Sequence, residues 1–358
     1  MKIENSKSLS SGELEIVGEE GDYFGKLILN GKRKRMFEVG LAYRTEDSLS
    51  FILPGNGGYL RLKKRDALWK GSFKYFGITA DLTANRIAEP SKDLMALVTL
   101  KPIGRGIIST FKEESFPSYD NKNQILYFTR DQDILSSKFD NGKWSTPNIL
   151  DINADFTNNA PSISADGNTL LFTSNHPLDS SSFKKKNIWS AKYKEGKWSK
   201  PRPFPYPINI DSLGDYHQSI SAMGNIYFVS YNRTNGFGRS DIYKASKTSV
   251  DSYEVNNLGD SINTDLSEAD VFIDSQERYL IFASTGRDDS YGADDIYISH
   301  NTNGRWTKPI NLGPKVNSFA YEYGAWVDHK NGYLYFNSYR RGTSDIYRIK
   351  LSELELFN

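Results

Sequence analysis

The stretch that decides the fold is residues 295–299, Asp-Ile-Tyr-Ile-Ser, because the chain repeats it at four other places. Residues 241–245 and 345–349 are close copies, residues 187–191 are a looser copy, and residues 133–137 are the most eroded. Each copy follows a short aromatic strand with a Phe near its end, and three copies are followed by Gly-Lys/Arg-Trp-Ser/Thr-x-Pro. The chain therefore contains an internal repeat whose unit is a set of short strands.

The spacing of the repeat predicts a β-propeller. The short strand that begins each unit places equivalent positions at Pro117, Pro161, Gln218, Asp270 and Gly324, at intervals of 44, 57, 52 and 54 residues. Propeller blades are spaced by roughly 40–50 residues and contain four strands, and each unit offers four strand candidates. We therefore expect an all-β chain that contains a five-bladed propeller, with Tyr, Phe and Trp side chains packed between the blades.

These phrases resemble the WD40-like repeats of the TolB propeller family over residues 107–351. Members of that family include periplasmic binding partners, accessory domains of prolyl-oligopeptidase-like enzymes and some polysaccharide lyases. The resemblance implies a periplasmic or outer-membrane-anchored protein of a Gram-negative bacterium, and a cytoplasmic location stays open. It leaves the function open as well, because one fold supports many functions.

The first ninety residues carry no copy of the repeat. They contain six or seven short alternating strands with probable hairpin turns at residues 30–31 and 57–58. Sequential strands of this length predict a small antiparallel β-barrel or sandwich, with a packed interior rather than a ligand cavity. Residues 69–73, Trp-Lys-Gly-Ser-Phe, resemble small β-barrel domains that precede hydrolases in Bacteroidetes-type proteins.

The domain boundaries follow from these two patterns. We expect a barrel over residues 1–90 and a propeller over residues 91–358. The fifth unit lacks the turn that would lead to a fourth strand, because residues 345–351 run straight into the end of the chain. Residues 96–100, Ala-Leu-Val-Thr-Leu, belong to neither series, so we expect them to pair with the fifth unit and close the ring.

The composition limits the classes of partner that we expect for this chain. The formal net charge is +1, from 45 Lys and Arg against 44 Asp and Glu, which gives no reason to expect nucleic acid or an acidic membrane. No run approaches the roughly 18 apolar residues of a membrane span. The first residues lack the apolar segment of a secretion signal, so either the protein is cytoplasmic or a signal was removed. The absence of Cys excludes disulfides, thiol catalysis and Cys-ligated metals, and we expect a monomer without a cofactor.

The sequence contains no recognisable catalytic set. Its four histidines lack zinc-ligand spacing, Gly-x-Ser-x-Gly is missing, and acidic residues 288–289 and 294–295 lack the spacing of a calcium loop. The Asp of the repeated phrase recurs as Asp241, Asp295 and Asp345. Recurrence in successive units predicts a structural role, in which the carboxylate accepts hydrogen bonds from backbone amides of a neighbouring turn.

Residues that do not repeat are the candidates for a binding site. We take Pro117, Pro161, Gln218, Asp270 and Gly324 as the marker positions of the five units, and we expect one mouth of the channel at the residues just before them. Two residues before the markers lie Ser115, Asn159, Tyr216, Glu268 and Glu322, and one residue before them lie Phe116, Ala160, His217, Ala269 and Tyr323. Glu114 and Asp215 lie one step further out, and the loops after the second strands carry Arg130, His176, Arg233, Arg287 and Arg341. Either these charges form a binding mouth around an aromatic pocket, or they form a self-satisfied ring of ion pairs that plugs the channel.

Three functions remain open from the sequence. The favoured one is a non-enzymatic module that binds a peptide, a protein partner or a glycan at the mouth, because aromatic and Arg side chains carry most interface energy. The binding candidates are Glu114, Phe116, Asn159, Asp215, Tyr216, His217, Glu268, Glu322, Tyr323, Arg233, Arg287 and Arg341. The alternative is a glycoside hydrolase that uses Asp215, Glu268 and Glu322. In a third reading the barrel senses a ligand and the propeller is a scaffold.

Overall fold

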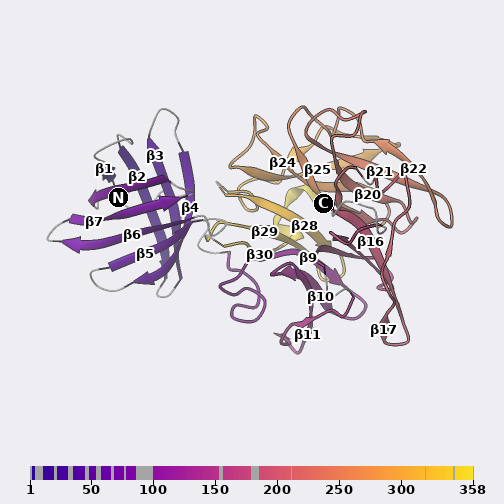
Figure 1. Ribbon diagram of the computed structural model, residues 1–358, viewed down its shortest axis with the longest axis horizontal. Helices are drawn as coiled ribbons and strands as arrows, with labels where there is room; N and C mark the ends of the chain where they lie inside the picture. The colour runs from indigo at the N-terminus through magenta and orange to yellow at the C-terminus, as the bar shows by residue number, and fades with distance from the viewer. Residues whose placement is uncertain are drawn as a thin grey trace. The chain divides into compact units, whose positions relative to one another are not determined.

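A computed structural model gives the fold (Figure 1). It describes residues 2–4, 11–19, 22–30, 35–44, 48–53, 58–65, 68–75, 78–85, 100–152, 156–178, 185–210, 212–318, 320–341 and 343–357. Strands dominate these residues, and the α-helix is absent from the described part of the chain. Accordingly, no described helix is long and apolar enough to span a membrane.

The N-terminal strands form a closed antiparallel barrel in which each strand pairs with the next in sequence. The barrel closes because Lys2 and Ile3 of the first strand also pair with Asn85 and Ala84 of the last. Described interior positions such as Leu27, Phe51 and Leu60 are fully buried. The strands are β1 (Lys2–Glu4), β2 (Ser11–Glu19), β3 (Asp22–Asn30), β4 (Arg35–Arg44), β5 (Ser48–Leu53), β6 (Gly58–Arg65), β7 (Leu68–Tyr75) and β8 (Ile78–Asn85).

The barrel thus has eight described strands, more than the six or seven expected. The three-residue β1 and the weakly apolar β8, Ile-Thr-Ala-Asp-Leu-Thr-Ala-Asn, are hard to recognise in the sequence. Their pairing with each other removes both free edges of the sheet, which an open sandwich would have left exposed.

Five antiparallel sheets follow, and their first strands contact one another around a central channel. The predicted five-bladed propeller is therefore confirmed. Blade 1 contains β9 (Glu114–Asp120), β10 (Ile125–Arg130), β11 (Asp133–Asp140), β12 (Lys143–Trp144) and β13 (Asn148–Ile149). Blade 2 contains β14 (Asn158–Ile163), β15 (Thr169–Ser174), β16 (Asn187–Lys194), β17 (Lys197–Trp198) and β18 (Arg202–Pro203).

The other three blades follow the same order from the channel outward. Blade 3 contains β19 (Asp215–Ile220), β20 (Ile226–Tyr231), β21 (Ser240–Ser249) and β22 (Ser252–Asn257). Blade 4 contains β23 (Glu268–Ile273), β24 (Tyr279–Thr285), β25 (Asp294–Thr302), β26 (Arg305–Trp306) and β27 (Ile310–Asn311). Blade 5 contains β28 (Glu322–Asp328), β29 (Tyr333–Ser338) and β30 (Asp345–Lys350), followed by the 3-10 turns η2 (Leu351–Glu353) and η3 (Glu355–Phe357).

The repeated aromatic residues form the core between blades, as expected. The Phe near the end of each second strand is fully buried, at Phe128, Phe172, Phe228, Phe282 and Phe336. The Tyr of the repeated phrase is also fully buried in blades 3, 4 and 5. Each blade therefore contributes a buried Phe to the core, and blades 3, 4 and 5 add a buried Tyr, which explains why the sequence repeats these rings.

The structural role predicted for the repeated Asp is confirmed in blades 3 and 4. Asp241 accepts hydrogen bonds from the backbone N–H groups of Phe237 (3.0 Å) and Gly238 (3.3 Å). Asp295 accepts from the N–H groups of Tyr291 (2.7 Å) and Gly292 (3.2 Å). Each carboxylate therefore holds the loop that leads into its own strand.

A repeated Asn joins consecutive blades, and the sequence analysis did not identify it. In blade 3 the Ile242 N–H donates to Oδ1 of Asn263 (2.8 Å), and Asn263 Nδ2 donates to the Ile242 carbonyl (2.9 Å). Asn209 and Asn317 make the same pair of bonds after blades 2 and 4. The visible signal is an Asn 21 residues after the Ile of the repeated phrase.

The ring is closed by residues that precede blade 1. The N–H of Ile103 donates to the carbonyl of Ile346 in β30 (2.9 Å). This bond corresponds to the one from Leu312 to Ile296, by which the connector after blade 4 pairs with β25. Blade 5 has three strands among its described residues, in agreement with the missing turn. Of the predicted closing strand, residues 96–99 lie outside the described residues, and its pairing stays a prediction.

Candidate ligand site at the mouth of the propeller channel

All five innermost strands share a bulge at the same place, and its central residue has a left-handed backbone. These residues are Phe116, Ala160, His217, Asp270 and Gly324, with φ between 49° and 60°. In the first four blades the pairing register of the strand shifts at this point. The bulge places one residue per blade on the lining of the channel.

The bulge corrects the alignment of the five units. The marker positions Pro117, Pro161 and Gln218 lie one residue after the true equivalents of Asp270 and Gly324. The positions two before the bulge are therefore Glu114, Asn158, Asp215, Glu268 and Glu322, all of which are buried. Four of the five carry a carboxylate, so this is a repeated position and the apparent variety at it came from the shifted alignment.

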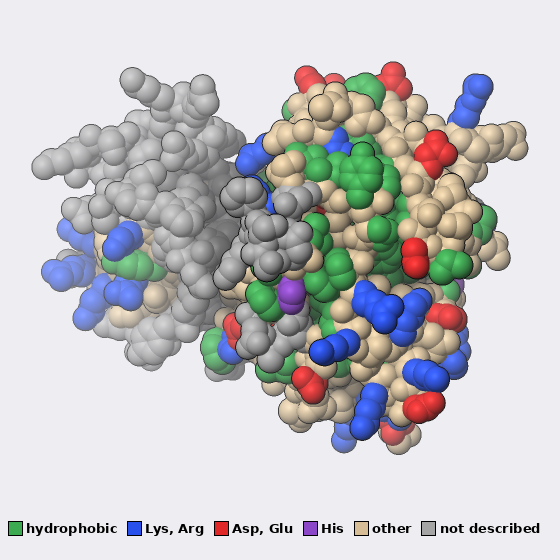
Figure 2. All heavy atoms as spheres, turned by 45° about the vertical axis from the view of Figure 1, so that its right-hand side comes forward, with side chains coloured by type: hydrophobic (Ala, Val, Ile, Leu, Met, Phe, Trp, Pro, Cys, Tyr) green, Lys and Arg blue, Asp and Glu red, His purple; other side chains and the backbone are tan. Residues whose placement is uncertain are grey.

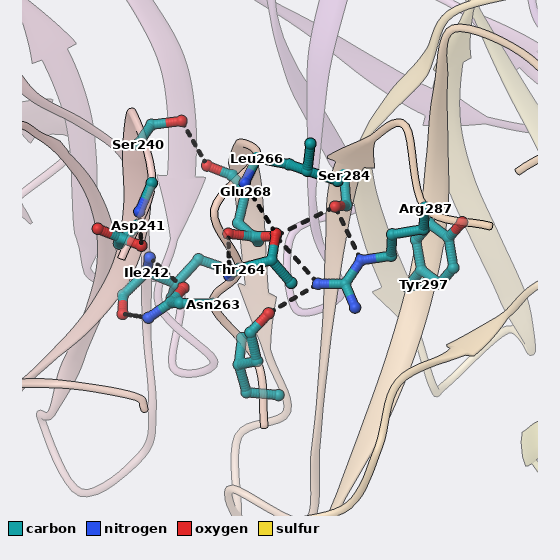
Figure 3. Close-up of polar contacts among 12 residues, drawn as sticks. Ser240, Asp241, Ile242, Asn263, Thr264, Leu266, Glu268, Ser284, Arg287 and Tyr297 are labelled. Carbon is teal, nitrogen blue, oxygen red and sulfur yellow. Dashed lines mark hydrogen bonds and ion pairs between the residues drawn. The ribbon is translucent and has the colours of Figure 1, made fainter. Parts of the chain in front are cut away.

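These carboxylates form a repeated buried ion pair, shown for blade 4 in Figure 3. Glu268 accepts hydrogen bonds from the N–H (3.0 Å) and Oγ1 (2.7 Å) of Thr264 and from Nη2 of Arg287 (3.0 Å). Arg287 also donates to Oγ of Ser284 (2.8 Å) and to the carbonyl of Ile262 (2.7 Å). Burial raises the pKa of Glu268, and the bonds to Thr264 and Arg287 oppose that shift.

Blades 1 and 3 repeat this arrangement. Arg130 donates to Glu114 (2.8 Å), and Arg233 donates to Asp215 (2.8 Å). Both Arg side chains also donate to backbone carbonyls of the connector that precedes their blade. We call each carboxylate–Arg pair a clamp, because it ties the start of an innermost strand to its connector. The clamp positions are internal, so they do not present their charges to a ligand at the mouth.

The remaining predicted cations have other surroundings. In blade 2 the clamp position is Asn158, and His176 packs against Phe156 and Trp189, with ring centroids 4.1 and 4.6 Å away. In the fifth blade Arg341 is buried and donates to the carbonyl of Leu100 (3.3 Å). Neither cation reaches the channel lining.

The bulge residues themselves line the channel. His217 forms an ion pair with Asp270 through Nδ1, and its ring lies 4.6 Å from that of Phe116. The Phe116 ring also meets Tyr323 edge-on at 5.5 Å, and Tyr216 meets His217 edge-on at 4.4 Å. The cavity that the bulge residues line has a volume of about 30 Å3, which is room for about one water molecule. The structure therefore brings together Phe116, Tyr216, His217 and Tyr323 of the predicted site.

Asp294 adds a second carboxylate near the mouth. It begins β25 and accepts a hydrogen bond from Oγ1 of Thr285 (2.6 Å). Burial raises its pKa, and the nearby charge of Asp270 adds to the shift. In blade 3 the corresponding residue is Ser240, so this carboxylate is not part of the repeat. In the sequence it stands out only as one of the acidic residues 294–295, which lack the spacing of a calcium loop.

Exposed apolar side chains lie on blades 3 and 4 at the same end of the strands as the bulges. We call Tyr231, Phe237, Leu266 and Tyr291 the aromatic rim, and their exposed fractions are 37%, 50%, 38% and 48%. Phe237 and Tyr291 occupy the same place, four residues before the repeated Asp. The connector and loop are bound together, because the Arg239 N–H donates to the carbonyl of Leu266 (3.1 Å). The sequence analysis missed the rim, although that spacing could have indicated it.

A metal site has no support in the described part of the chain, where no three His, Asp or Glu side chains lie close enough to share an ion. Asn159, another predicted site residue, is half-buried beside Ala160 on β14. Its Oδ1 has no hydrogen-bond partner.

Comparisons with known proteins find the fold and nothing closer. No protein-family model and no curated protein matches the chain. Similar solved structures include a putative TolB from Agrobacterium tumefaciens, at 15% identity over 68% of this chain and 78% of that one (TM-score 0.45). TolB from Acinetobacter baumannii is 10% identical over 94% and 78% (TM-score 0.42), and a glycoside hydrolase is 9% identical over 74% and 96% (TM-score 0.48). The expected similarity to TolB-like propellers is confirmed, and at these identities it concerns the fold alone.

Proposed function

We propose that the propeller is a non-enzymatic binding module that holds a peptide segment of a protein partner at the channel mouth. The observation that carries this proposal is the set of five bulge residues. They share one left-handed backbone conformation and differ in residue type: Phe, Ala, His, Asp and Gly. A periplasmic location in a Gram-negative bacterium belongs to the same proposal and is supported by the family resemblance of the repeat.

The choice of Phe and His at this position argues for function. A left-handed backbone suits Gly and, less well, Asn, Asp or His, whereas a bulky residue such as Phe there is an outlier. Phe116 and His217 therefore cost conformational free energy that Gly would avoid. Strain of this kind is typical of functional sites, where a side chain has to be held in one direction.

The charges at the mouth favour a cationic group on the ligand. The Arg side chains of blades 1, 3 and 4 are held in the clamps, whereas the carboxylate of Asp270 lies on the channel lining and is close enough to Asp294 to influence its pKa. A Lys or Arg side chain beside these carboxylates would also meet the rings of Phe116 and Tyr323, and cations are attracted to aromatic faces. The Asp270 carboxylate would then exchange its contact with His217 for one with the cationic group of the ligand.

The aromatic rim supports a protein partner rather than a small solute. The cavity in the channel is too small for an amino-acid side chain, so a ligand has to gain most of its contacts on the surface around it. Exposed Tyr and Phe side chains are enriched at interfaces, and neighbouring apolar groups of this kind mark interaction sites. A peptide that crosses the rim and places one basic side chain over the mouth satisfies both features.

A glycoside hydrolase fits the geometry less well. Asp215 and Glu268 are fully buried and bonded to Arg, and Glu322 is fully buried, so they do not reach a glycosidic oxygen. The carboxylates that could replace them are Asp270 and Asp294, of which Asp294 has the raised pKa that a general acid needs. Loss of hydrolysis in Asp294→Asn, in a preparation that cleaves a glycan, would favour the enzyme.

The test uses the backbone preference of the bulge. Phe116→Gly and His217→Gly remove the side chains at positions where Gly is favourable, and Ala160→Gly is the matched control in blade 2. The probe is a random peptide library displayed on phage, selected on the wild-type chain. Selected peptides should be rich in Lys or Arg, and both mouth variants should bind them at least ten-fold more weakly than wild type and the control.

Two results would overturn the proposal. Equal affinity of all four proteins for the selected peptides would place binding elsewhere. A fall of many degrees in the melting temperature of Phe116→Gly, without selected peptides from the wild type, would show that Phe116 and His217 plug the channel.

A further inference from the structure

The barrel carries a concentration of positive charge that the whole chain does not. Residues 48–75 contain six Lys and Arg and one Asp, whereas the complete chain has a net charge of +1. The six basic residues are Arg61, Lys63, Lys64, Arg65, Lys70 and Lys74, and all are exposed. In Figure 2 blue side chains crowd the described part of the barrel, at the left. The segment is therefore basic in a chain that is otherwise slightly acidic.

The strand register places five of these cations, all except Lys64, on one outer face. Along β6, Leu60 and Leu62 are buried while Arg61 and Lys63 are exposed, so the basic side chains point away from the interior. Lys70 of β7 lies directly opposite Lys63 of β6. This pairing brings two positive charges close together on the outer face of the barrel, where like charges at directly opposite positions repel each other.

The face is hollowed where short side chains stand among the long basic ones. Ser48 and Ser50 of β5 lie opposite Lys63 and Arg61, and Ser72 of β7 lies opposite Arg61 on its other side. These residues and Lys70 line a hollow of about 740 Å3. That volume is in the range of sites for small molecules or a few sugar units. Cations flanked by hydroxyl groups provide charge and directed hydrogen bonds for anionic groups.

We infer that this hollow binds an acidic polysaccharide, whose carboxylate or sulfate groups pair with Arg61, Lys63 and Lys70 while the serines bond its oxygens. The described lining residues include no aromatic ring for stacking bases, which single-stranded nucleic acids require. The ring of Tyr59, on the same strand as Arg61, is covered by the Arg61 guanidinium 4.2 Å from its centroid. A recessed surface also fits a polymer strand better than it fits the plane of a lipid bilayer.

The experiment compares two triple variants of the complete chain. Arg61→Gln, Lys63→Gln and Lys70→Gln remove the charge of the hollow. Lys143→Gln, Lys197→Gln and Arg305→Gln are the matched control, because they remove one Arg and two Lys from exposed positions of the propeller. The probes are polygalacturonate for carboxylates and heparin for sulfates, with dextran as the neutral polymer, each measured at 50 and 300 mM salt.

We expect wild type and control to bind an acidic polymer, more weakly at the higher salt because charge pairing is screened, and not to bind dextran. The hollow variant should bind at least ten-fold more weakly. If it does not fold, Arg61→Gln alone should weaken binding at least three-fold. The inference is overturned by equal binding of the two triple variants, by no binding of either acidic polymer, or by tighter binding of single-stranded DNA or of phosphatidylglycerol vesicles.

Discussion

On each innermost strand of the propeller, two positions two residues apart behave in opposite ways. The first, at Glu114, Asp215 and Glu268, carries a buried carboxylate held by an Arg, and its chemistry is repeated from blade to blade. The second, at Phe116, His217 and Asp270, lines the channel and differs in every blade. A position with the same side-chain chemistry in several blades stabilises the blade. A position that has the same backbone conformation in every blade but different side chains can be adapted to bind a ligand.

The largest expected effect concerns ring closure. Between blades 4 and 5 the connector bond lies within a continuous stretch of chain, whereas the corresponding bond from Ile103 to Ile346 joins blade 5 to the segment that precedes blade 1. Ile103 is buried and packs with Ile108 and Ile346 between blades 1 and 5. A chain that begins at residue 106 loses this residue and leaves the edge of β30 unpaired, so we expect it to aggregate. A chain that begins at residue 91 should fold without the barrel, as judged by light scattering and thermal unfolding.

A chain that begins at residue 102 sharpens this prediction. It keeps the bond from Ile103 to Ile346 and lacks the predicted closing strand at residues 96–100. If it is as stable as the chain from residue 91, Ile103 is sufficient for closure. If the chain from residue 106 is equally stable and soluble, closure does not depend on this segment at all.

The next effect tests the clamp. Arg287→Ala leaves the Glu268 carboxylate buried without its cation, and removing one partner of a buried pair costs about 3–5 kcal/mol. Urea denaturation should show a loss of that size in the free energy of unfolding. Arg305→Ala, an exposed Arg in the same blade, should change it by less than about 0.5 kcal/mol. A stable Arg287→Ala protein with weakened peptide binding would move Arg287 from the clamp to the mouth.

Much of the fold could be predicted because its signals are local and repeated. The Phe of the second strand recurs in all five units, the Asp of the repeated phrase in four and its Tyr in three, and each keeps the same kind of position in the blade. The alignment failed by one residue in blades 1 to 3 because the left-handed bulge has an unusual occupant there. Asp270 and Gly324 suit a left-handed backbone and mark the bulge, whereas Phe116, Ala160 and His217 do not.

The candidate site was harder to predict, because it depends on the directions in which long Arg side chains point. Nothing in the spacing of Arg233 and Arg287 shows that each turns towards its connector and away from the channel axis. The rim depends on exposure, which a Phe or Tyr in a loop does not reveal by itself. Phe116, His217 and Tyr323 could be predicted as site residues because their residue types do not repeat from blade to blade. The repeated carboxylate position has a structural role, whereas the variable position two residues later lines the channel.

A smaller effect is expected for the repeated Asp of blade 4. Asp295→Ala removes the acceptor for the N–H groups of Tyr291 and Gly292 and for Nδ2 of Asn311. A buried donor without a partner costs about 1–3 kcal/mol, so unfolding in urea should show a loss in that range. Asp241→Ala in blade 3 should lose a similar amount, because it makes the same backbone bonds. A loss in one blade only would show that the two positions are not equivalent.

The smallest effect distinguishes Asp294 from its neighbour, since only Asp295 belongs to the repeat. Burial raises the pKa of Asp294 in the folded chain above its usual value near 3.8. A carboxyl group with a raised folded pKa contributes most to stability when it is protonated, and that contribution is lost as the pH rises through the folded pKa. At pH 7 the ionised Asp294 therefore costs stability.

Asp294→Asn keeps the acceptor for the Thr285 hydroxyl and removes the charge, so it should stabilise the protein at pH 7 by less than about 1 kcal/mol. The gain should shrink as the pH falls towards 4, when wild-type Asp294 becomes protonated, and urea midpoints between pH 4 and pH 8 would follow it. The same variant should bind basic peptides more weakly, because it removes a carboxylate from the mouth. A variant that is less stable at pH 7 would show that the charge of Asp294 has a structural partner, and the residue would then join the repeated positions rather than the mouth.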